Sequence, residues 1–193
     1  MKLFKLLAMA GLLILTSFFF FPFEFTFLPG MNTKMVMAGV GLVVMAFHFA
    51  RRGEIVPDKD FVGIVGLSLL VSVIGFAAIT YNSTNDYTYA TSFVSMAVWL
   101  GAAFVVVRAM GKVHGEVDVE LVCNYLIVLC TVQCLIAISM SYIPSLKSFV
   151  DSFLAGYGFM GKTDDRIYGI GCGLDVAGSR FCAVMMMVAE MMR

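Results

Sequence analysis

The sequence has few charged residues. Lysine and arginine account for 13 of its 193 residues, and aspartate and glutamate account for another 13. A typical soluble globular domain has about 25% charged residues, whereas this chain has 13% and is 61% hydrophobic. The mean hydropathy of +0.94 agrees with that imbalance. The composition therefore excludes an ordinary soluble domain and indicates that lipid surrounds most of the chain.

Several signals of soluble function are missing as well. The formal net charge is zero and the basic residues are scattered, so nothing indicates binding to nucleic acid. No H-E-x-x-H or C-x-x-C motif is present, and we predict neither a metal nor an organic cofactor. Cys123, Cys130 and Cys134 fall on roughly one face of a predicted helix. A metal or thiol site there is one interpretation, but small buried apolar residues are the favoured one.

What the chain does have is a series of long apolar runs. A membrane-spanning helix needs about 20 apolar residues, and continuous runs favour helices over a membrane barrel. We predict an all-α fold, a polytopic transmembrane helix bundle that forms a single transmembrane domain over residues 1–193. The second run is short and the last contains charges. The six predicted membrane helices are Leu3–Phe21, Met35–Ala50, Phe61–Thr80, Ser92–Met110, Leu121–Ile143 and Cys172–Met192.

Small residues predict how these helices pack against one another. Basic residues predict how the helices are oriented in the membrane. Gly75 and Gly101 belong to small-residue faces that allow helices to approach closely in lipid. The first run has no small-residue cleavage site after it, so we interpret it as an uncleaved helix. If the N-terminus is cytoplasmic, the short connections on the cytoplasmic side carry about twice as many basic residues as those on the outer side. The chain is therefore expected to cross the membrane several times, with its N-terminus in the cytoplasm.

A shorter amphipathic segment follows the fifth run. Over residues 144–156 the apolar side chains recur at helical spacing, with polar side chains opposite them. We predict an amphipathic helix that begins at Pro144 and lies in the outer membrane interface instead of crossing it. Its apolar residues are Leu146, Phe149, Val150, Phe153 and Leu154, and its polar residues are Lys147, Ser148, Asp151 and Ser152.

The stretch "TDDRIYGIGCGLDVAGSR" contains several charged residues and glycines, and it continues directly into the last apolar run. Charges inside a membrane segment are costly and usually face a cavity or a partner, so Asp175 and Arg180 are candidate functional residues. Arginine can pair bidentately with phosphate oxygens, and exposed glycine N–H groups add donors. A carboxylate could orient or deprotonate a sugar hydroxyl. An equally weighted alternative is that Asp175 and Arg180 pair with each other, or with helices beyond this sequence, to fix helix packing.

The pattern "DRIYGIGCGLDVAGSRFCAVM" resembles the segment before a membrane helix in the O-antigen polymerase and O-antigen ligase family. The stretches "FPFEFTFLPGMNTKM", "RRGE", "YATSFVSMAVWLGAAFVVV" and "NYLIVLCTVQCLIAI" similarly resemble the N-terminal half of such polymerases from Bacteroides-type bacteria. The resemblance implies a glycosyltransferase-type membrane protein that acts on undecaprenyl-diphosphate-linked glycan, its expected partner, at the periplasmic face. It also implies that this sequence is the N-terminal part of a longer protein.

By this resemblance, Arg166 is the first candidate for contact with diphosphate or glycan. Arg180 and Asp175 come second, with Gly169 and Gly171 supplying backbone contacts. The sequence reads "LDVAGSR" where family members often have His or Asn beside Pro, which leaves Asp175 a weak catalytic candidate. A transporter or flippase component and a non-catalytic membrane scaffold are the two alternative functions.

Overall fold

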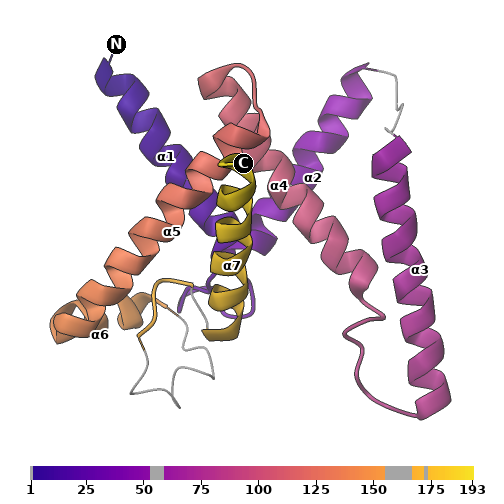
Figure 1. Cartoon of the computed structure of the whole chain (residues 1–193). Helices are drawn as coiled ribbons and strands as arrows, with labels where there is room; N and C mark the ends of the chain where they lie inside the picture. The colour runs from indigo at the N-terminus through magenta and orange to yellow at the C-terminus, as the bar shows by residue number, and fades with distance from the viewer. Residues whose placement is uncertain (1, 53–58, 155–166, 172–173) are drawn as a thin grey trace. The chain divides into compact units, whose positions relative to one another are not determined.

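The computed structural model describes residues 2–52, 59–154, 167–171 and 174–193. The all-α prediction is confirmed. In these residues the only β pairing consists of two isolated bridges, Glu24 with Asn32 and Phe25 with Leu154. The helices, shown in Figure 1, are α1 (Lys2–Phe20), α2 (Thr33–Arg52), α3 (Lys59–Asn82), α4 (Ser92–His114), α5 (Val119–Tyr142), α6 (Pro144–Phe153) and α7 (Leu174–Met191).

Four of these helices are long and apolar enough to cross a membrane, so the protein is a multi-pass membrane protein. The prediction of six such helices is wrong for the residues that the structure describes. The apolar part of α2, Thr33–Phe47, is too short to qualify, and α7 carries Asp175, Arg180 and Glu190 within its 18 residues. The four helices that qualify contribute Leu3–Phe20, Val62–Asn82, Ser92–His114 and Val119–Tyr142.

Helix α3 shows most clearly what surrounds the protein. Only 17% of its apolar window is buried within the chain, and its exposed side chains include Leu67, Val73 and Ile74. In water such a surface would be a large apolar patch of the kind that monomeric soluble proteins avoid. In a bilayer, this surface contacts acyl chains instead of water, so its exposure is not unfavourable.

The chain divides into two compact units. The first unit comprises residues 1–36 and 106–193, and the second comprises residues 37–105. In the second unit, a Cβ atom at Gly41 of α2 would overlap the carbonyl oxygen of Gly101 in α4. A Cβ atom at Gly75 of α3 would lie 2.6 Å from the backbone nitrogen of Ala90. The predicted close helix approach is thus confirmed at Gly101, whereas Gly75 packs against the turn that precedes α4.

A serine joins α3 to α4 inside the second unit. The Ser72 hydroxyl accepts a hydrogen bond of 2.8 Å from the backbone N–H of Phe93, the second residue of α4. Ser72 itself is buried. The bond satisfies one of the backbone donors that the first turn of a helix leaves without a partner, which matters because no water reaches such a donor in lipid.

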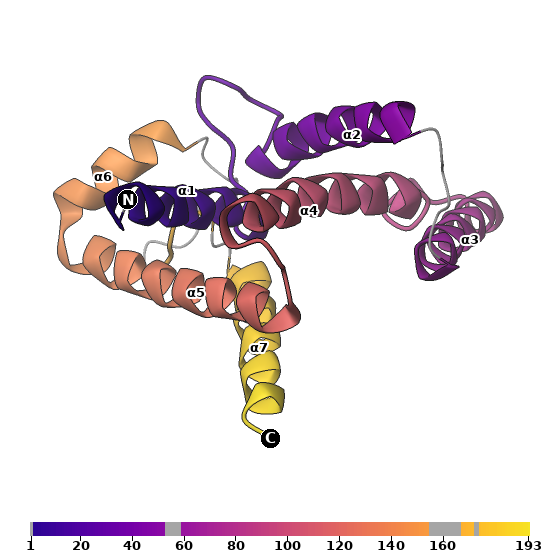
Figure 2. The same ribbon diagram turned by 90° about the horizontal axis from the view of Figure 1, so that it is seen from above.

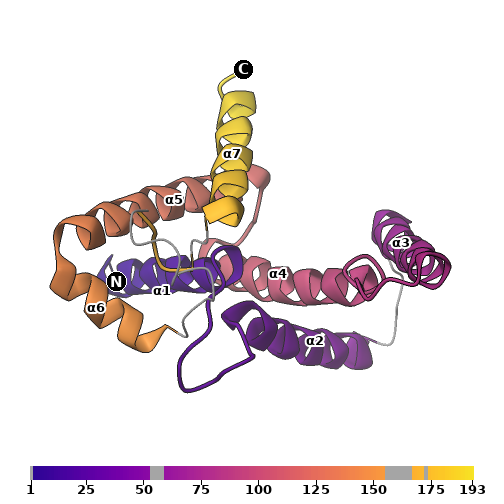
Figure 3. The same cartoon turned by 90° about the horizontal axis from the view of Figure 1, so that it is seen from below.

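In the first unit, α1, α5 and α7 meet around Phe21. Its side chain is fully buried and packs with Leu126, Leu129 and Cys130 of α5 and Val184 of α7. Figures 2 and 3 show α1 and α5 side by side, with α7 beginning next to α5. Cys123 and Cys130 are buried, as predicted for small apolar residues, whereas Cys134 is exposed. This core fixes where the segments between the helices lie.

Candidate functional site

The end of α1 anchors the start of α2. The Thr33 hydroxyl donates a hydrogen bond of 2.9 Å to the carbonyl oxygen of Phe18 and accepts one of 3.3 Å from the backbone N–H of Phe23. The backbone N–H of Thr33 also donates to the carbonyl oxygen of Phe23, at 2.9 Å. These bonds hold Lys34, the next residue, beside the last turn of α1.

The segment Ile167–Gly171, which precedes α7, packs against the same end of α1. Gly169 and Gly171 are both buried. Gly171 has φ +69°, and a Cβ atom on it would overlap the carbonyl oxygen of Phe21. Only glycine combines that backbone conformation with so close an approach. The backbone freedom predicted for this segment is therefore used to reach the turn after α1.

The same segment lies beside the middle of α5. The side-chain amide of Gln133 donates a hydrogen bond of 3.0 Å to the carbonyl oxygen of Ile170. Gln133 is buried, and its Oε1 atom has no hydrogen-bond partner within the described residues. Non-helical backbone at the depth of a membrane helix is tolerated where protein buries it. The prediction of irregular backbone at membrane depth thus agrees with the position of Ile170.

Arg180 lies in the second turn of α7 and is half-buried. Its guanidinium carbon is 5.8 Å from the ring centroids of both Phe20 and Phe21, within the range of a cation–π interaction. Lys34 is held at the same end of α1 by the hydrogen bonds of Thr33. Two cationic residues are therefore placed at the end of α1, where their combined positive charge would favour an anion.

Lys34 was not predicted as part of this site, because nothing in the local sequence distinguishes it from the other basic residues between the helices. Its neighbour Arg180 is supplied by a helix far along the chain, and the hydrogen bonds of Thr33 bring Lys34 to the end of α1. The only local signal was a polar side chain at the first position of α2.

Two predicted site residues have side chains outside the part of the chain that the structure describes. Arg166 lies outside the described residues. Asp175 belongs to the first turn of α7, but its side chain also lies outside the described part. The alternative in which Asp175 pairs with Arg180 therefore stays a prediction.

Helix α6 contacts the segment before α7 through its polar side chains. The hydroxyl of Tyr168 donates to the carboxylate of Asp151, with distances of 2.9 Å to Oδ1 and 2.8 Å to Oδ2. The Nζ atom of Lys147 lies 5.3 Å from the centroid of the Tyr168 ring. These contacts tie the start of the Ile167–Gly171 segment to α6.

A second signal was overlooked in the sequence. Residues 156–163 read "GYGFMGKT", which matches the G-x-x-x-x-G-K-[ST] pattern of phosphate-binding loops. That loop follows a strand in nucleotide-binding proteins, whereas the described residues before this one form helix α6. The residues of the pattern lie outside the described part. Without the strand, the match does not indicate a nucleotide-binding domain.

The other polar contacts and the apolar cavity have structural explanations. Nε2 of His114 lies 2.8 Å from the hydroxyl of Tyr125 and joins α4 to α5. Within the described residues, no group of three or more His, Cys, Asp or Glu side chains is arranged to hold a metal ion.

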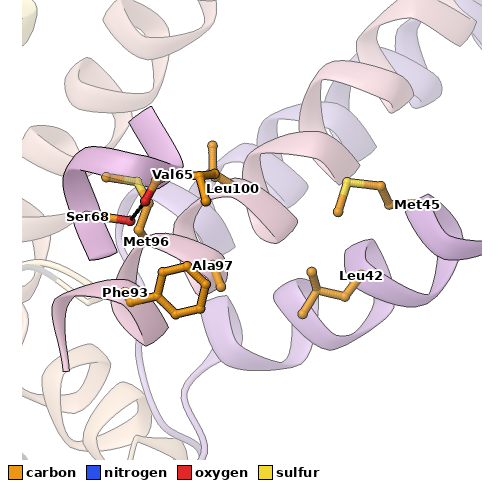
Figure 4. Close-up of a pocket in the computed structure, with 8 residues that line it drawn as sticks. All are labelled: Leu42, Met45, Val65, Ser68, Phe93, Met96, Ala97 and Leu100. Atoms are coloured by element: carbon orange, nitrogen blue, oxygen red, sulfur yellow. Dashed lines mark hydrogen bonds between the residues drawn. The ribbon is translucent and has the colours of Figure 1, made fainter. Parts of the chain in front are cut away.

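Figure 4 shows an apolar cavity in the second unit, of about 100 Å³. The hydroxyl of Ser68 in its wall donates to the carbonyl oxygen of Val65, which leaves that hydroxyl without a proton to offer a ligand.

The chain matches no family model, no curated protein and no solved structure. The resemblance to O-antigen polymerases and ligases thus depends on the sequence stretches that carry it.

Proposed function

We propose that the protein acts in surface polysaccharide biosynthesis, on O-antigen or capsule, in the bacterial inner membrane. In this proposal it polymerises or ligates glycan carried on undecaprenyl diphosphate at the periplasmic face. The observation that supports it is the placement of two cations at the end of α1. Arg180 lies over the rings of Phe20 and Phe21, and the hydrogen bonds of Thr33 hold Lys34 at the same end. A guanidinium next to an ammonium group suits a diphosphate, which carries negative charge on several oxygens.

The proposed reaction explains why cations are needed. When a glycan leaves undecaprenyl diphosphate, the bond between its anomeric carbon and the phosphate oxygen breaks. A hydroxyl of the acceptor forms the new bond to that carbon and loses its proton to a base. The diphosphate leaves with additional negative charge, which fixed cations stabilise. Arg180 and Lys34 would hold that group, Arg166 would assist, and Asp175 is the weak candidate for the base.

The direction of the helices supports an outward-facing site. The backbone N–H of Thr26, after α1, donates to the carbonyl oxygen of Phe153, at the end of α6 and so beyond α5. The ends of α1 and α5 therefore share one side of the membrane. If only α3 and α4 crossed between them, α5 would end on the opposite side. The hydrogen bond favours an odd number of crossings between them, and we propose that α2, α3 and α4 supply these crossings.

The apolar part of α2, Thr33–Phe47, is short, but the whole helix is long enough for this assignment. Its 20 residues extend about 30 Å, the thickness of the hydrocarbon core. Five crossings with a cytoplasmic N-terminus put the ends of α1 and α5 in the periplasm. The same arrangement keeps Arg51 and Arg52, at the end of α2, in the cytoplasm, as the distribution of basic residues predicts.

The function is tested by the length of the surface polysaccharide. The complete gene would carry Arg180→Gln or Arg166→Ala in a strain that lacks its own copy, and Lys112→Gln would serve as a control on the exposed end of α4. We expect both arginine variants to shorten or abolish the polysaccharide ladder on gels at normal protein abundance, with a loss of at least about tenfold in long chains. The control should give the wild-type ladder.

Three outcomes would contradict the proposal. An unaltered ladder for both arginine variants would refute their part in glycan transfer. A ladder that falls only in proportion to protein abundance would indicate a scaffold, in which the charged residues hold helices together. Unpolymerised repeat units that accumulate on the cytoplasmic side would point to a flippase component instead.

A further inference from the structure

Helix α6 exposes its two phenylalanines more than its charged side chains. Phe149 is 63% exposed and Phe153 is 51% exposed, and their rings pack edge to face with centroids 5.0 Å apart. Lys147 and Asp151, on the polar side of the helix, are half-buried in the contacts with Tyr168. A surface helix of a soluble protein has the reverse arrangement, with its apolar side toward the protein.

The position of α6 explains this reversal. Only Ile143 separates α6 from Tyr142, the last residue of the membrane-crossing helix α5. Helix α6 therefore begins where α5 leaves the hydrocarbon core. At that depth the environment changes from acyl chains to head groups, and an amphipathic helix buries its apolar side there. The phenylalanine side chain has no polar atom, so contact with an acyl chain is more favourable for it than contact with water or a sugar hydroxyl.

A second aromatic segment is bonded to the end of α6. Phe25 and Leu154 form an antiparallel bridge, next to the hydrogen bond of 3.0 Å from Thr26 to Phe153. The rings of Phe25 and Phe27 stack with centroids 4.8 Å apart, and Phe27 is 72% exposed. The segment after α1 thus adds another exposed ring to the part of the chain that contains α6.

We propose that Phe149 and Phe153, together with Phe27, insert into the leaflet in which α5 ends, and that α6 anchors the segment before α7 to this lipid surface. The partner is the boundary between acyl chains and head groups. The anchor works through Asp151, whose carboxylate holds Tyr168, two residues before Ile170. This inference depends on the membrane crossings and not on the proposed reaction with glycan.

The test uses tryptophan fluorescence in the full chain. The native Trp99 is the only tryptophan and would be replaced in a Trp99→Phe background. Phe149→Trp and Ser148→Trp would then each supply a single probe, on the apolar and the polar side of α6. The proteins would be reconstituted into phosphatidylcholine vesicles whose acyl chains carry bromine near the head group, with iodide as the quencher in water.

We expect the brominated lipid to quench the Phe149→Trp probe by about twofold or more, while iodide leaves it nearly unchanged. The Ser148→Trp probe should respond in the opposite way. Quenching of the Phe149→Trp probe by iodide and not by bromine would overturn the proposal, because it would place Phe149 in water. Protection from both quenchers would also overturn it, since another protein surface, such as a second copy of the chain, would then cover Phe149.

Discussion

Gly171→Ala is expected to destabilise the first unit by about 2–4 kcal/mol. The residue has φ +69°, which costs an L side chain about 1 kcal/mol or more. Its new methyl group would also overlap the carbonyl oxygen of Phe21, whose side chain is fully buried in the core of this unit. Neither backbone can move without breaking that core. Thermal unfolding of the detergent-solubilised protein measures the loss.

Gly178→Ala is the matched control for this change. Gly178 lies in α7, and nothing lies within 4 Å of the Cβ atom that alanine would add. Alanine there should leave stability unchanged or raise it by up to about 1 kcal/mol, because it favours the helix. Equal melting temperatures for the two variants would show that the segment before α7 does not pack on α1 as described.

Gly41→Leu should have a comparably large effect in the second unit, about 3 kcal/mol or more. Even a methyl group at Gly41 would overlap the carbonyl oxygen of Gly101, so a leucine must push α2 away from α4. In lipid, helices associate through close packing instead of through a hydrophobic driving force, and separation removes most of that attraction. Limited proteolysis and thermal unfolding would both report it.

The control for this variant is two residues away on the same helix. Gly39 is exposed, and nothing lies within 4 Å of the Cβ atom that a side chain would add to it. Gly39→Leu should therefore place its side chain in lipid and preserve the wild-type stability. If Gly39→Leu proved as harmful as Gly41→Leu, the close approach of α2 and α4 would not be the cause.

The sequence was most informative where physical chemistry acts locally. The long charge-free runs identified the four membrane helices, since a bilayer admits few charges. Amphipathic spacing predicted a helix over residues 144–156, close to the observed α6 at Pro144–Phe153. Helices α2 and α7 were predicted as helices but fall outside the four long apolar ones. Their short apolar run or internal charges, both visible in the sequence, explain why.

Contacts between distant residues could not be predicted. Lys34 and Arg180 are both placed at the end of α1 because Thr33 and the segment before α7 pack there. The side of α6 that faces the protein was equally hidden. Spacing shows that a helix has two sides, but the contact of Asp151 with Tyr168 decides which of them meets the protein and which meets lipid.

The membrane topology tests the account most directly, because the proposed site requires the ends of α1 and α5 to face the periplasm. Alkaline phosphatase, active only in the periplasm, would be inserted after Met31, after Thr84 and after Gly115, in the connections that follow α1, α3 and α4. Five crossings predict activity at Met31 and Thr84 and none at Gly115. Activity at both Met31 and Gly115 would contradict the account, because α2 would then not cross the membrane and α1 and α5 would end on opposite sides.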